Sequence, residues 1–408
     1  MSRLLMYIYK AAVVGAGAMG AGIAQVISYS GLPVVLKDVN PEAVQKGIST
    51  IRKIYQGRVD KGKMTSSEME QKMMLVSGAT DYSGFADVDI VIEAVFEDLK
   101  VKQALFREID RICPEGTIFA TNSSSLSISE IGAATRRPEK LIGLHFFNPA
   151  PAMKLVEVIA GLATSQETID DAVAFAEGLR KIPIRVQECA GFLVNRLLSP
   201  YLNEAAFCLQ EGSASLKEID DAVLAFGMPM GPFILSDMIG IDVAAKVAEV
   251  LFDAYGPRMR PAEILGRLVA AKRLGTKSGA GFYDYDPAAE TRLGDLIGKV
   301  QKEAGLSKAP FSVNRLMLAM VNEAVIALQE GVSSAADIDT AMLAGTGFPQ
   351  ARGGPLHFAD QLGIDVVLSE LVRLKDLLGS RFWPAPMLKR MVGAGHLGVK
   401  SGKGFFQY

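Results

Sequence analysis

The glycine triplet Gly15-x-Gly17-x-x-Gly20 is the feature that most constrains the fold of this chain. It joins a short β-type run, residues 11–14, to a segment whose apolar residues recur at helical spacing. A second apolar run, "PVVLKD", follows and ends at Asp38. A strand, a glycine-rich turn, a helix and a second strand that ends in a carboxylate are typical of a dinucleotide-binding βαβ unit. The alternative is a βα turn that binds nothing, and the acidic residue in its expected place favours the dinucleotide.

Each glycine of the triplet has its own expected role in binding the cofactor. Gly15 allows the tight turn, Gly17 lets the backbone approach a pyrophosphate, and Gly20 lets helix and strand pack closely. The N-terminus of the helix then offers free N–H groups to the phosphates. Asp38 can accept hydrogen bonds from the ribose hydroxyls, whereas a 2′-phosphate would lie beside a like charge. At ~4 Å and an effective dielectric of ~20 that repulsion is about 4 kcal/mol, so NAD is predicted over NADP.

Further parallel strands are predicted along the first part of the chain. "DVDIVIEAV", residues 87–95, reads as a continuous apolar strand that is buried on both faces. "GTIFATNSSS", residues 116–125, ends in a polar cluster, and open α/β sheets bind ligands beyond the carboxyl ends of their strands. Residues 41–78 read as a long helical stretch whose many lysines and arginines form a solvated face. We therefore predict an α/β Rossmann-type domain over residues 1–187.

Bulk composition narrows the classes of partner. A chain of 408 residues is too long for one average core. The formal net charge of -2 and the pI of about 6.1 argue against nucleic acid or an acidic membrane surface as partner. The three cysteines show no paired metal-type spacing, and their odd number favours a reducing compartment over a disulfide framework. No apolar run reaches the ~18 residues that cross a bilayer. We expect a cytoplasmic protein without a metal site.

The remaining sequence is an internal repeat. Residues 194–223 match residues 313–342 at 15 of 30 positions, and residues 274–285 match residues 397–408 at 8 of 12. The offset between the copies grows from 119 to 123 residues, which indicates an insertion near "GFPQARGGP". Two matched blocks in the same order indicate duplication, and each copy can bury an apolar face against the other.

Both copies begin with apolar residues at helical spacing, so an all-α C-terminal region is predicted. We place the first copy at residues 188–292 and the second at residues 293–408, with the seam around "DPAAETRLGD".

"GLHFFNPAPAMKLVEVI", residues 143–159, carries His145 and Glu157 inside two apolar, strand-like runs. The connection with its prolines can bring these strands side by side. An unpaired polar group costs roughly 1–3 kcal/mol to bury, so we expect the two side chains to pair. Imidazole titrates near neutrality and suits a general base, and a carboxylate that accepts its Nδ1–H fixes its orientation. The residues alone leave a purely structural pair open.

Together these motifs resemble the L-3-hydroxyacyl-CoA dehydrogenase family. The resemblance rests on "VVGAGAMGAGIAQ", "DIVIEAVFEDLKVKQALFREID", "TNSSSLSI", "GLHFFNPAPAMKLVEVI", "CAGFLVNRLL" and "LGTKSGAGFYDY" and covers essentially the whole chain. "HFFNP" followed by "KLVEV" is its most specific part. The duplicated helical region is similar to the dehydrogenase half of multifunctional fatty-acid oxidation proteins. Because the chain starts only ten residues before its first strand, we expect no enoyl-CoA hydratase module and no hydration activity.

The resemblance implies a reversible, NAD-linked oxidation of an L-3-hydroxyacyl-CoA to the 3-ketoacyl-CoA in fatty-acid β-oxidation or related acyl-CoA metabolism. It implies a general base with a carboxylate partner, two substrate-binding residues and two cofactor contacts. The general base would be His145, and its partner would be Glu157. Ser124 and Asn195 would bind the substrate, and Glu97 and Lys102 would contact the cofactor. Asn314 repeats Asn195, but only the first copy directly follows the nucleotide domain, so the substrate role is assigned to Asn195 alone.

Other readings remain open at this point. The same fold can persist as a catalytically silent scaffold that binds acyl-CoA and NAD. Dehydrogenases of the 6-phosphogluconate or 3-hydroxyisobutyrate type also combine a nucleotide domain with helices, but they use a lysine as base. His357 and His396 have no carboxylate at comparable spacing in a strand pair, so we expect structural or surface roles. Single-copy relatives dimerise through the helical region. We expect the second copy to occupy the partner's place within one chain, so that the protein can work as a monomer.

Overall fold

The computed structural model describes residues 6–286, 292–304 and 309–408. Contacts divide the chain into two compact units, residues 1–192 and residues 193–408. Half of the predicted seam between the helical copies, residues 287–291, lies outside the described residues. The placement of that seam stays a prediction.

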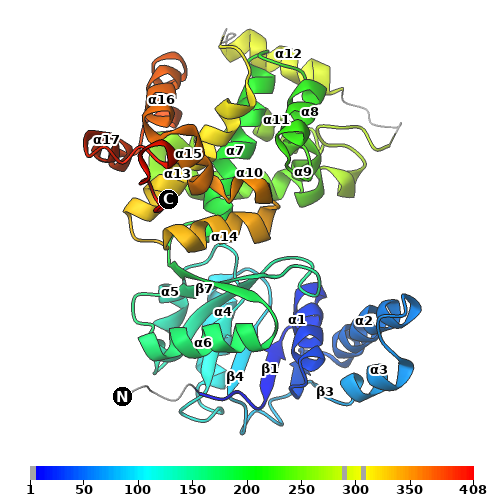
Figure 1. Ribbon diagram of the computed structural model, residues 1–408. Coiled ribbons are helices and arrows are strands. Elements are labelled where there is room, and N and C mark those ends of the chain that lie inside the picture. The colour runs from blue at the N-terminus through cyan, green and yellow to red at the C-terminus, as the bar shows by residue number, and fades with distance from the viewer. Residues whose placement is uncertain (1–5, 287–291, 305–308) are drawn as a thin grey trace. The chain divides into compact units, whose positions relative to one another are not determined.

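The first unit is built on an eight-stranded sheet in the order β3-β2-β1-β4-β5-β6-β7-β8 (Figure 1). Its strands are β1 (Ala11–Val14), β2 (Val34–Lys37), β3 (Val76–Ala79), β4 (Ile90–Glu93), β5 (Ile118–Thr121), β6 (Leu141–Phe146), β7 (Leu155–Ala160) and β8 (Ile182–Gln187). The strands from β3 to β6 pair in parallel, and β7 then runs antiparallel to β6. This order is that of a doubly wound nucleotide-binding sheet, which confirms the predicted Rossmann-type class.

Helices cover both faces of this sheet. They are α1 (Ala18–Tyr29), α2 (Pro41–Asp60), α3 (Ser66–Met73), α4 (Leu99–Ile109), α5 (Ile128–Gly132) and α6 (Gln166–Gly178), with the 3₁₀ turn η1 (Pro138–Lys140). Buried residues of α1 and α6, such as Ile23 and Phe175, share one core with alternate strand residues. On α4, Phe106 contacts Phe119 of β5, whose side chain belongs to the other set. Alternate residues of a strand face opposite sides, so α4 covers the second face.

The prediction of one helical stretch over residues 41–78 was wrong in detail. The segment divides into α2, α3 and the edge strand β3. Thr65 starts α3 with a capping box, in which its side chain and that of Glu68 satisfy each other's backbone N–H groups. The residues of β3 are exposed or partly buried, and β3 lies at one edge of the described sheet, where it pairs with β2. Such a short edge strand lacks the apolar pattern that sequence reasoning relies on.

The second unit is helical, as predicted. Its elements are α7 (Phe192–Gln210), α8 (Leu216–Phe226), α9 (Pro232–Ile239), α10 (Ile241–Tyr255), η2 (Gly256–Met259), α11 (Glu263–Ala270), η3 (Thr276–Ser278), α12 (Leu293–Ala304), α13 (Val313–Gln329), α14 (Ala335–Thr346), η4 (Gln350–Arg352), α15 (Pro355–Leu362), α16 (Ile364–Leu378), η5 (Ser380–Phe382), α17 (Pro386–Gly393) and η6 (Val399–Ser401). The series from α7 to η3 recurs from α13 to η6 in the same order. The extra turn η4 lies at the predicted insertion.

Reciprocal ion pairs join the two helical copies. Arg196 on α7 contacts Glu323 on α13 at 2.7 Å, and Arg315 on α13 contacts Glu204 on α7 at 2.6 Å. The two arginines occupy equivalent positions of the repeat, as do the two glutamates. Each copy therefore presents to the other the same pair of charges, which is the pattern of an isologous dimer interface.

Candidate active site

His145 and Glu157 form a buried hydrogen-bonded pair. They are register partners across the antiparallel strands β6 and β7. Nδ1 of His145 lies 2.6 Å from Oε2 of Glu157. His145 is 7% exposed and Glu157 is 0% exposed. The fold therefore brings together the two polar residues that interrupt apolar runs, as the sequence predicted they would pair.

The pair is suited to holding and moving a proton. An ionised carboxylate can only accept a hydrogen bond, so Nδ1 donates and Nε2 is the nitrogen that can take up a proton. The rings of Phe147 and Phe192 lie 4.5 and 5.9 Å from the imidazole centre. Their apolar surfaces lower the local dielectric, which strengthens the attraction of Glu157 for an imidazolium.

The connection between β6 and β7 is anchored by a lysine that sequence reasoning missed. Nζ of Lys181 donates to the carbonyl oxygens of Ala150 at 2.6 Å and Met153 at 2.7 Å. Burial lowers the pKa of Lys181 to about 8. On the other side, Oδ1 of Asn122 accepts from the N–H of Phe146 at 2.8 Å, next to His145. These contacts tie the backbone around His145 to β5 and to the start of β8.

The glycine loop has the shape that its spacing predicts. Gly15 has a φ of +105°, and a side chain there would collide with the carbonyl of Ala94. A side chain at Gly20 would collide with the carbonyl of Gly15, so α1 and β1 approach closely. A Cβ at Gly17, by contrast, would meet nothing within 4 Å. Gly17 caps α1 without a side-chain hydrogen bond, which leaves the N-terminal N–H groups of the helix available to a pyrophosphate.

Asp38 follows β2 directly beside this loop. Its Oδ2 accepts from the N–H of Ala16 at 2.6 Å, and its Oδ1 accepts from the N–H of Val39 at 2.7 Å. These two bonds fix the carboxylate next to the glycine turn while each oxygen keeps a further lone pair. The arrangement fits the ribose hydroxyls of NAD.

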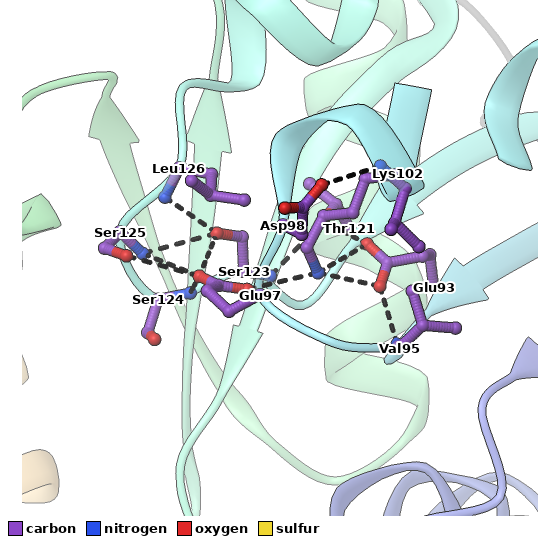
Figure 2. Close-up of polar contacts among 11 residues, drawn as sticks. Glu93, Val95, Glu97, Asp98, Lys102, Thr121, Ser123, Ser124, Ser125 and Leu126 are labelled. Carbon is purple, nitrogen blue, oxygen red and sulfur yellow. Dashed lines mark hydrogen bonds and ion pairs between the residues drawn. The ribbon is translucent and has the colours of Figure 1, made fainter. Parts of the chain in front are cut away.

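A network of buried charged residues lies at the ends of β4 and β5 (Figure 2). Nζ of Lys102 lies 2.7 and 2.9 Å from the two carboxylate oxygens of Glu93, and 3.2 Å from Oε2 of Glu97. Thr121 donates a further hydrogen bond to Glu93 at 2.6 Å. Glu93 and Lys102 are almost fully buried. All three N–H donors of Lys102 therefore have carboxylate oxygens within reach, and its predicted contact with the cofactor stays a prediction.

Glu97 connects this network to the loop that carries Ser124. Its Oε1 accepts from the hydroxyl of Ser123 at 2.5 Å and from the N–H groups of Ser124 at 3.0 Å and Ser125 at 3.2 Å (Figure 2). Burial acts to raise the pKa of Glu97, but the charge of Lys102 and these hydrogen bonds lower it below its usual value. The Ser124 residue itself is exposed. Glu97 thus orders the loop that presents Ser124, and its own contact with the cofactor stays a prediction.

Predicted site residues of the first unit lie together at the carboxyl ends of the parallel strands. Asp38, the glycine loop, Ser124 and His145 all lie at the carboxyl ends of β2, β1, β5 and β6. From β1 to β6 the sheet order is β1-β4-β5-β6, three strand steps, or about 14 Å at the usual strand spacing. An extended cofactor can lie across these strand ends, because open α/β sheets bind ligands there.

Asn195 lies in the first turn of α7, in the helical unit, and is partly exposed. It borders an apolar pocket whose other residues also belong to that unit. Its duplicate Asn314 is exposed at the start of α13.

The doubly wound sheet, the glycine turn and the carboxylate after β2 define the class of the first unit, a Rossmann-type dinucleotide-binding domain. The chain belongs to the 3-hydroxyacyl-CoA dehydrogenase family. The model of the NAD-binding domain of that family matches residues 10–189. The model of its C-terminal domain matches twice, at residues 191–285 and 311–408, which confirms the duplication.

Similar proteins agree with this assignment. The alpha subunit of the fatty acid oxidation complex of Shewanella amazonensis is 43% identical over 95% of this chain, and the match covers 55% of that protein. The chain thus spans about half the length of the curated relatives it matches. A 3-hydroxybutyryl-CoA dehydrogenase from Escherichia coli K12 is 33% identical over 96% of this chain and 100% of its own, with a TM-score of 0.88. An (S)-3-hydroxybutyryl-CoA dehydrogenase from Ralstonia eutropha is 42% identical over 69% of this chain and 100% of its own, with a TM-score of 0.67.

Among the described residues, none of the helices combines the length and the apolar character that crossing a membrane requires.

Proposed function

We propose that this chain oxidises an L-3-hydroxyacyl-CoA to the 3-ketoacyl-CoA with NAD, reversibly, and that His145 is the general base. The observation that carries the proposal is the 2.6 Å contact between Nδ1 of His145 and Oε2 of Glu157, buried between paired strands. A secondary alcohol must lose its hydroxyl proton as hydride leaves the same carbon. Bound NAD supplies the hydride acceptor. The remaining chemistry is a proton transfer, for which the pair is built.

Glu157 acts by orienting His145 and by stabilising the imidazolium. With Nδ1 donating to Glu157, Nε2 takes the hydroxyl proton, and the carboxylate balances the charge that forms on the ring. Ser124, on the loop ordered by Glu97, and Asn195, at the start of α7, are proposed to hydrogen-bond the substrate oxygen. Glu97 and Lys102 are proposed to contact the cofactor, and their own contacts with Glu93 and the Ser124 loop order the strand ends beside it.

The test is the oxidation of NADH with acetoacetyl-CoA, followed by absorbance. His145→Gln should lower kcat by about 10²–10⁴ while NAD affinity stays nearly intact, as expected for the loss of a general base. Glu157→Gln should also lower kcat, because a neutral amide stabilises the imidazolium less. A His145→Gln variant with full kcat would remove His145 from the mechanism.

The alternative is a catalytically silent scaffold that binds acyl-CoA and NAD. It would be favoured if the wild type bound NADH and showed no turnover with any 3-ketoacyl-CoA from C4 to C16. The glycine loop, Asp38 and the His145–Glu157 pair are all formed, which supports an active enzyme.

The cofactor preference has a separate test. Asp38 lies beside the glycine loop, where the 2′-phosphate of NADP would meet its charge. Asp38→Asn should narrow the preference for NAD over NADP, whereas equal binding of both cofactors by the wild type would contradict the proposed role.

We also propose that the helical copies form a pseudo-dimer within one chain, so that the protein works as a monomer in the cytoplasm. The reciprocal pairs of Arg196 with Glu323 and Arg315 with Glu204 support this, because each copy fills the place of a symmetric partner. Sedimentation should show a monomer, and an obligate dimer held through residues 313–342 would rule the proposal out.

A further inference from the structure

An apolar pocket lies along one face of α7 in the helical unit. Asn195, Leu198, Ser199 and Leu202 line it from α7, at positions that share one face of a helix. Ala248 of α10 also lines it. The walls are mainly hydrocarbon, and Asn195, already proposed to contact the substrate, is among the few polar side chains at this surface.

The second helical copy shows what keeps this space open. Ser199 corresponds to Leu318 in the repeat, and Ala248 corresponds to Leu371. Leu318 is 2% exposed and Leu371 is 0% exposed, so both are packed into the core of the second copy. Small side chains in the first copy thus stand where large ones fill the second.

The same contrast runs along the whole helix face. Leu198 and Leu202 are partly exposed, whereas their counterparts Met317 and Val321 are fully buried. A half-exposed apolar face on α7 leaves hydrophobic surface in contact with water, which costs free energy unless a ligand covers it.

We propose that this pocket binds the distal carbons of the substrate's acyl chain and that Ser199 and Ala248 set how long a chain it accepts. The inference rests on the proposed dehydrogenase function. Asn195 would hold the oxygen-bearing end of the acyl group, and the hydrocarbon beyond it would run along Leu198 and Leu202. A hydrocarbon chain matches this lining, because the pocket offers few partners for the polar groups of a nucleotide or pantetheine.

The size of the pocket predicts the range of chain lengths. Its cavity volume is about 60 Å³. One water-sized group needs roughly 10–15 Å³ by this measure, so the cavity holds about four to six groups of the size of a methylene. Each methylene removed from water is worth about fourfold in affinity. We expect kcat/KM to rise from C4 to about C8–C10 and then to level off, because longer chains extend out of the pocket.

The test exchanges residues between the two copies. Ser199→Leu and Ala248→Leu each place in the first copy the side chain of the second. Each should lower kcat/KM for C8 and C10 3-ketoacyl-CoA at least tenfold more than for acetoacetyl-CoA, mainly through KM. Ser199 is partly exposed, so Ser199→Leu keeps the test usable if the more buried Ala248→Leu fails to fold.

The control is Val367→Ala, the reverse exchange in the second copy, where Val367 corresponds to Ala244 of the pocket. It should leave the chain-length profile as in the wild type. Calorimetric titration with butyryl-, octanoyl- and dodecanoyl-CoA gives a readout independent of turnover, and Ser199→Leu should weaken only the longer two by tenfold or more.

An equal loss at all chain lengths in a folded variant, or no loss at any length, would overturn the assignment of the pocket. So would an altered profile in Val367→Ala. A wild type that turns over no 3-ketoacyl-CoA but binds NADH would instead overturn the proposed function, so the two failures are distinguishable.

Discussion

The two helical copies have the same order of elements, yet their first long helices face different surroundings. On α13 the residues from Arg315 to Val325 are all buried, whereas α7 exposes part of one face around Leu198 and Leu202. The charges that join the copies are repeated, but the small side chains that open a pocket occur only in the first copy. The residues that join the two copies are thus the same in both, whereas the residues that line the pocket in the first copy differ in the second.

A second difference concerns a buried carboxylate at equivalent positions. In the first copy, Asp220 accepts from the hydroxyl of Tyr283 at 2.7 Å. In the second copy, Asp339 pairs with Nδ1 of His357 at 2.7 Å. Phe406, which replaces the tyrosine, stacks on the His357 ring at 3.7 Å. The need for a side-chain donor is the same in both copies, and two different residues meet it.

The largest effect is expected where the two copies meet. Arg315→Met leaves Glu204 and Glu211 buried with one fewer cation, since Arg315 contacts both. Burial acts to lower the pKa of Arg315, but the charge of Glu204 raises it above its usual value, so the guanidinium is charged. Removing one partner of a buried ion pair costs about 3–5 kcal/mol. Urea unfolding followed by helical circular dichroism measures this loss.

Arg196→Met is the matched variant and should cost less, by at most about 1 kcal/mol, the upper end of what an exposed ion pair contributes. Its second partner, Glu330, is 43% exposed, whereas Glu211 is 11% exposed. Adding Glu204→Leu to Arg315→Met should recover part of the loss, because the uncompensated charge is then gone. A larger loss of unfolding free energy in Arg196→Met than in Arg315→Met would contradict the expected difference between these two ion pairs.

The next largest effect, on kcat/KM, should distinguish Asn195 from its duplicate Asn314. Asn195→Ala should lower kcat/KM for acetoacetyl-CoA by about 10- to 100-fold, the cost of leaving a substrate oxygen without its donor. Asn314→Ala, at the exposed duplicate position, should change kcat/KM by less than about twofold. Steady-state kinetics on both variants decides the point, and equal losses would mean that the second copy also serves the reaction.

Much of this organisation was predictable from the sequence. The glycine turn, Asp38 and the pairing of His145 with Glu157 followed from spacing and from the cost of burying an unpaired polar group. The duplication followed from self-similarity and was confirmed by the two family-model matches. These features depend on local patterns or on repeats, which a single sequence displays.

Other features depend on contacts between distant segments. Glu93 interrupts the apolar run of residues 87–95 just as Glu157 interrupts its own run, although the run as a whole has the pattern of a continuous buried strand. Applied there, the same argument about buried charge would have predicted a partner for Glu93, although not that it is Lys102. Lys181 gave no comparable signal, because it lies among exposed charges in the sequence and acts on the backbone carbonyls of a remote loop.

His357 was expected to be structural because no strand pair offered it a carboxylate. It does have one, Asp339, but that residue lies on a neighbouring helix. Packing between helices brings together residues whose spacing in sequence follows no fixed period. The pair therefore could not be predicted from the spacing rule that found His145 and Glu157.

The smallest effect tests whether the two ways of satisfying the buried carboxylate are interchangeable. His357→Ile places in the second copy the residue found at position 234 in the first, and it leaves Asp339 without its side-chain donor. The loss should be about 1–3 kcal/mol of unfolding free energy. Burial raises the pKa of Asp339 to about 6, so unfolding is measured above about pH 7, where the carboxylate is ionised.

Adding Phe406→Tyr to His357→Ile should restore at least half of this loss, because the new hydroxyl can reach Asp339 as Tyr283 reaches Asp220. Phe406→Tyr alone should be neutral or slightly destabilising, since His357 already occupies the carboxylate and stacks on the ring. The coupling between the two changes is the quantity of interest, and a double-mutant cycle measures it. Strictly additive losses would show that the copies differ in backbone geometry at this point, and that the tyrosine and the histidine are not equivalent solutions.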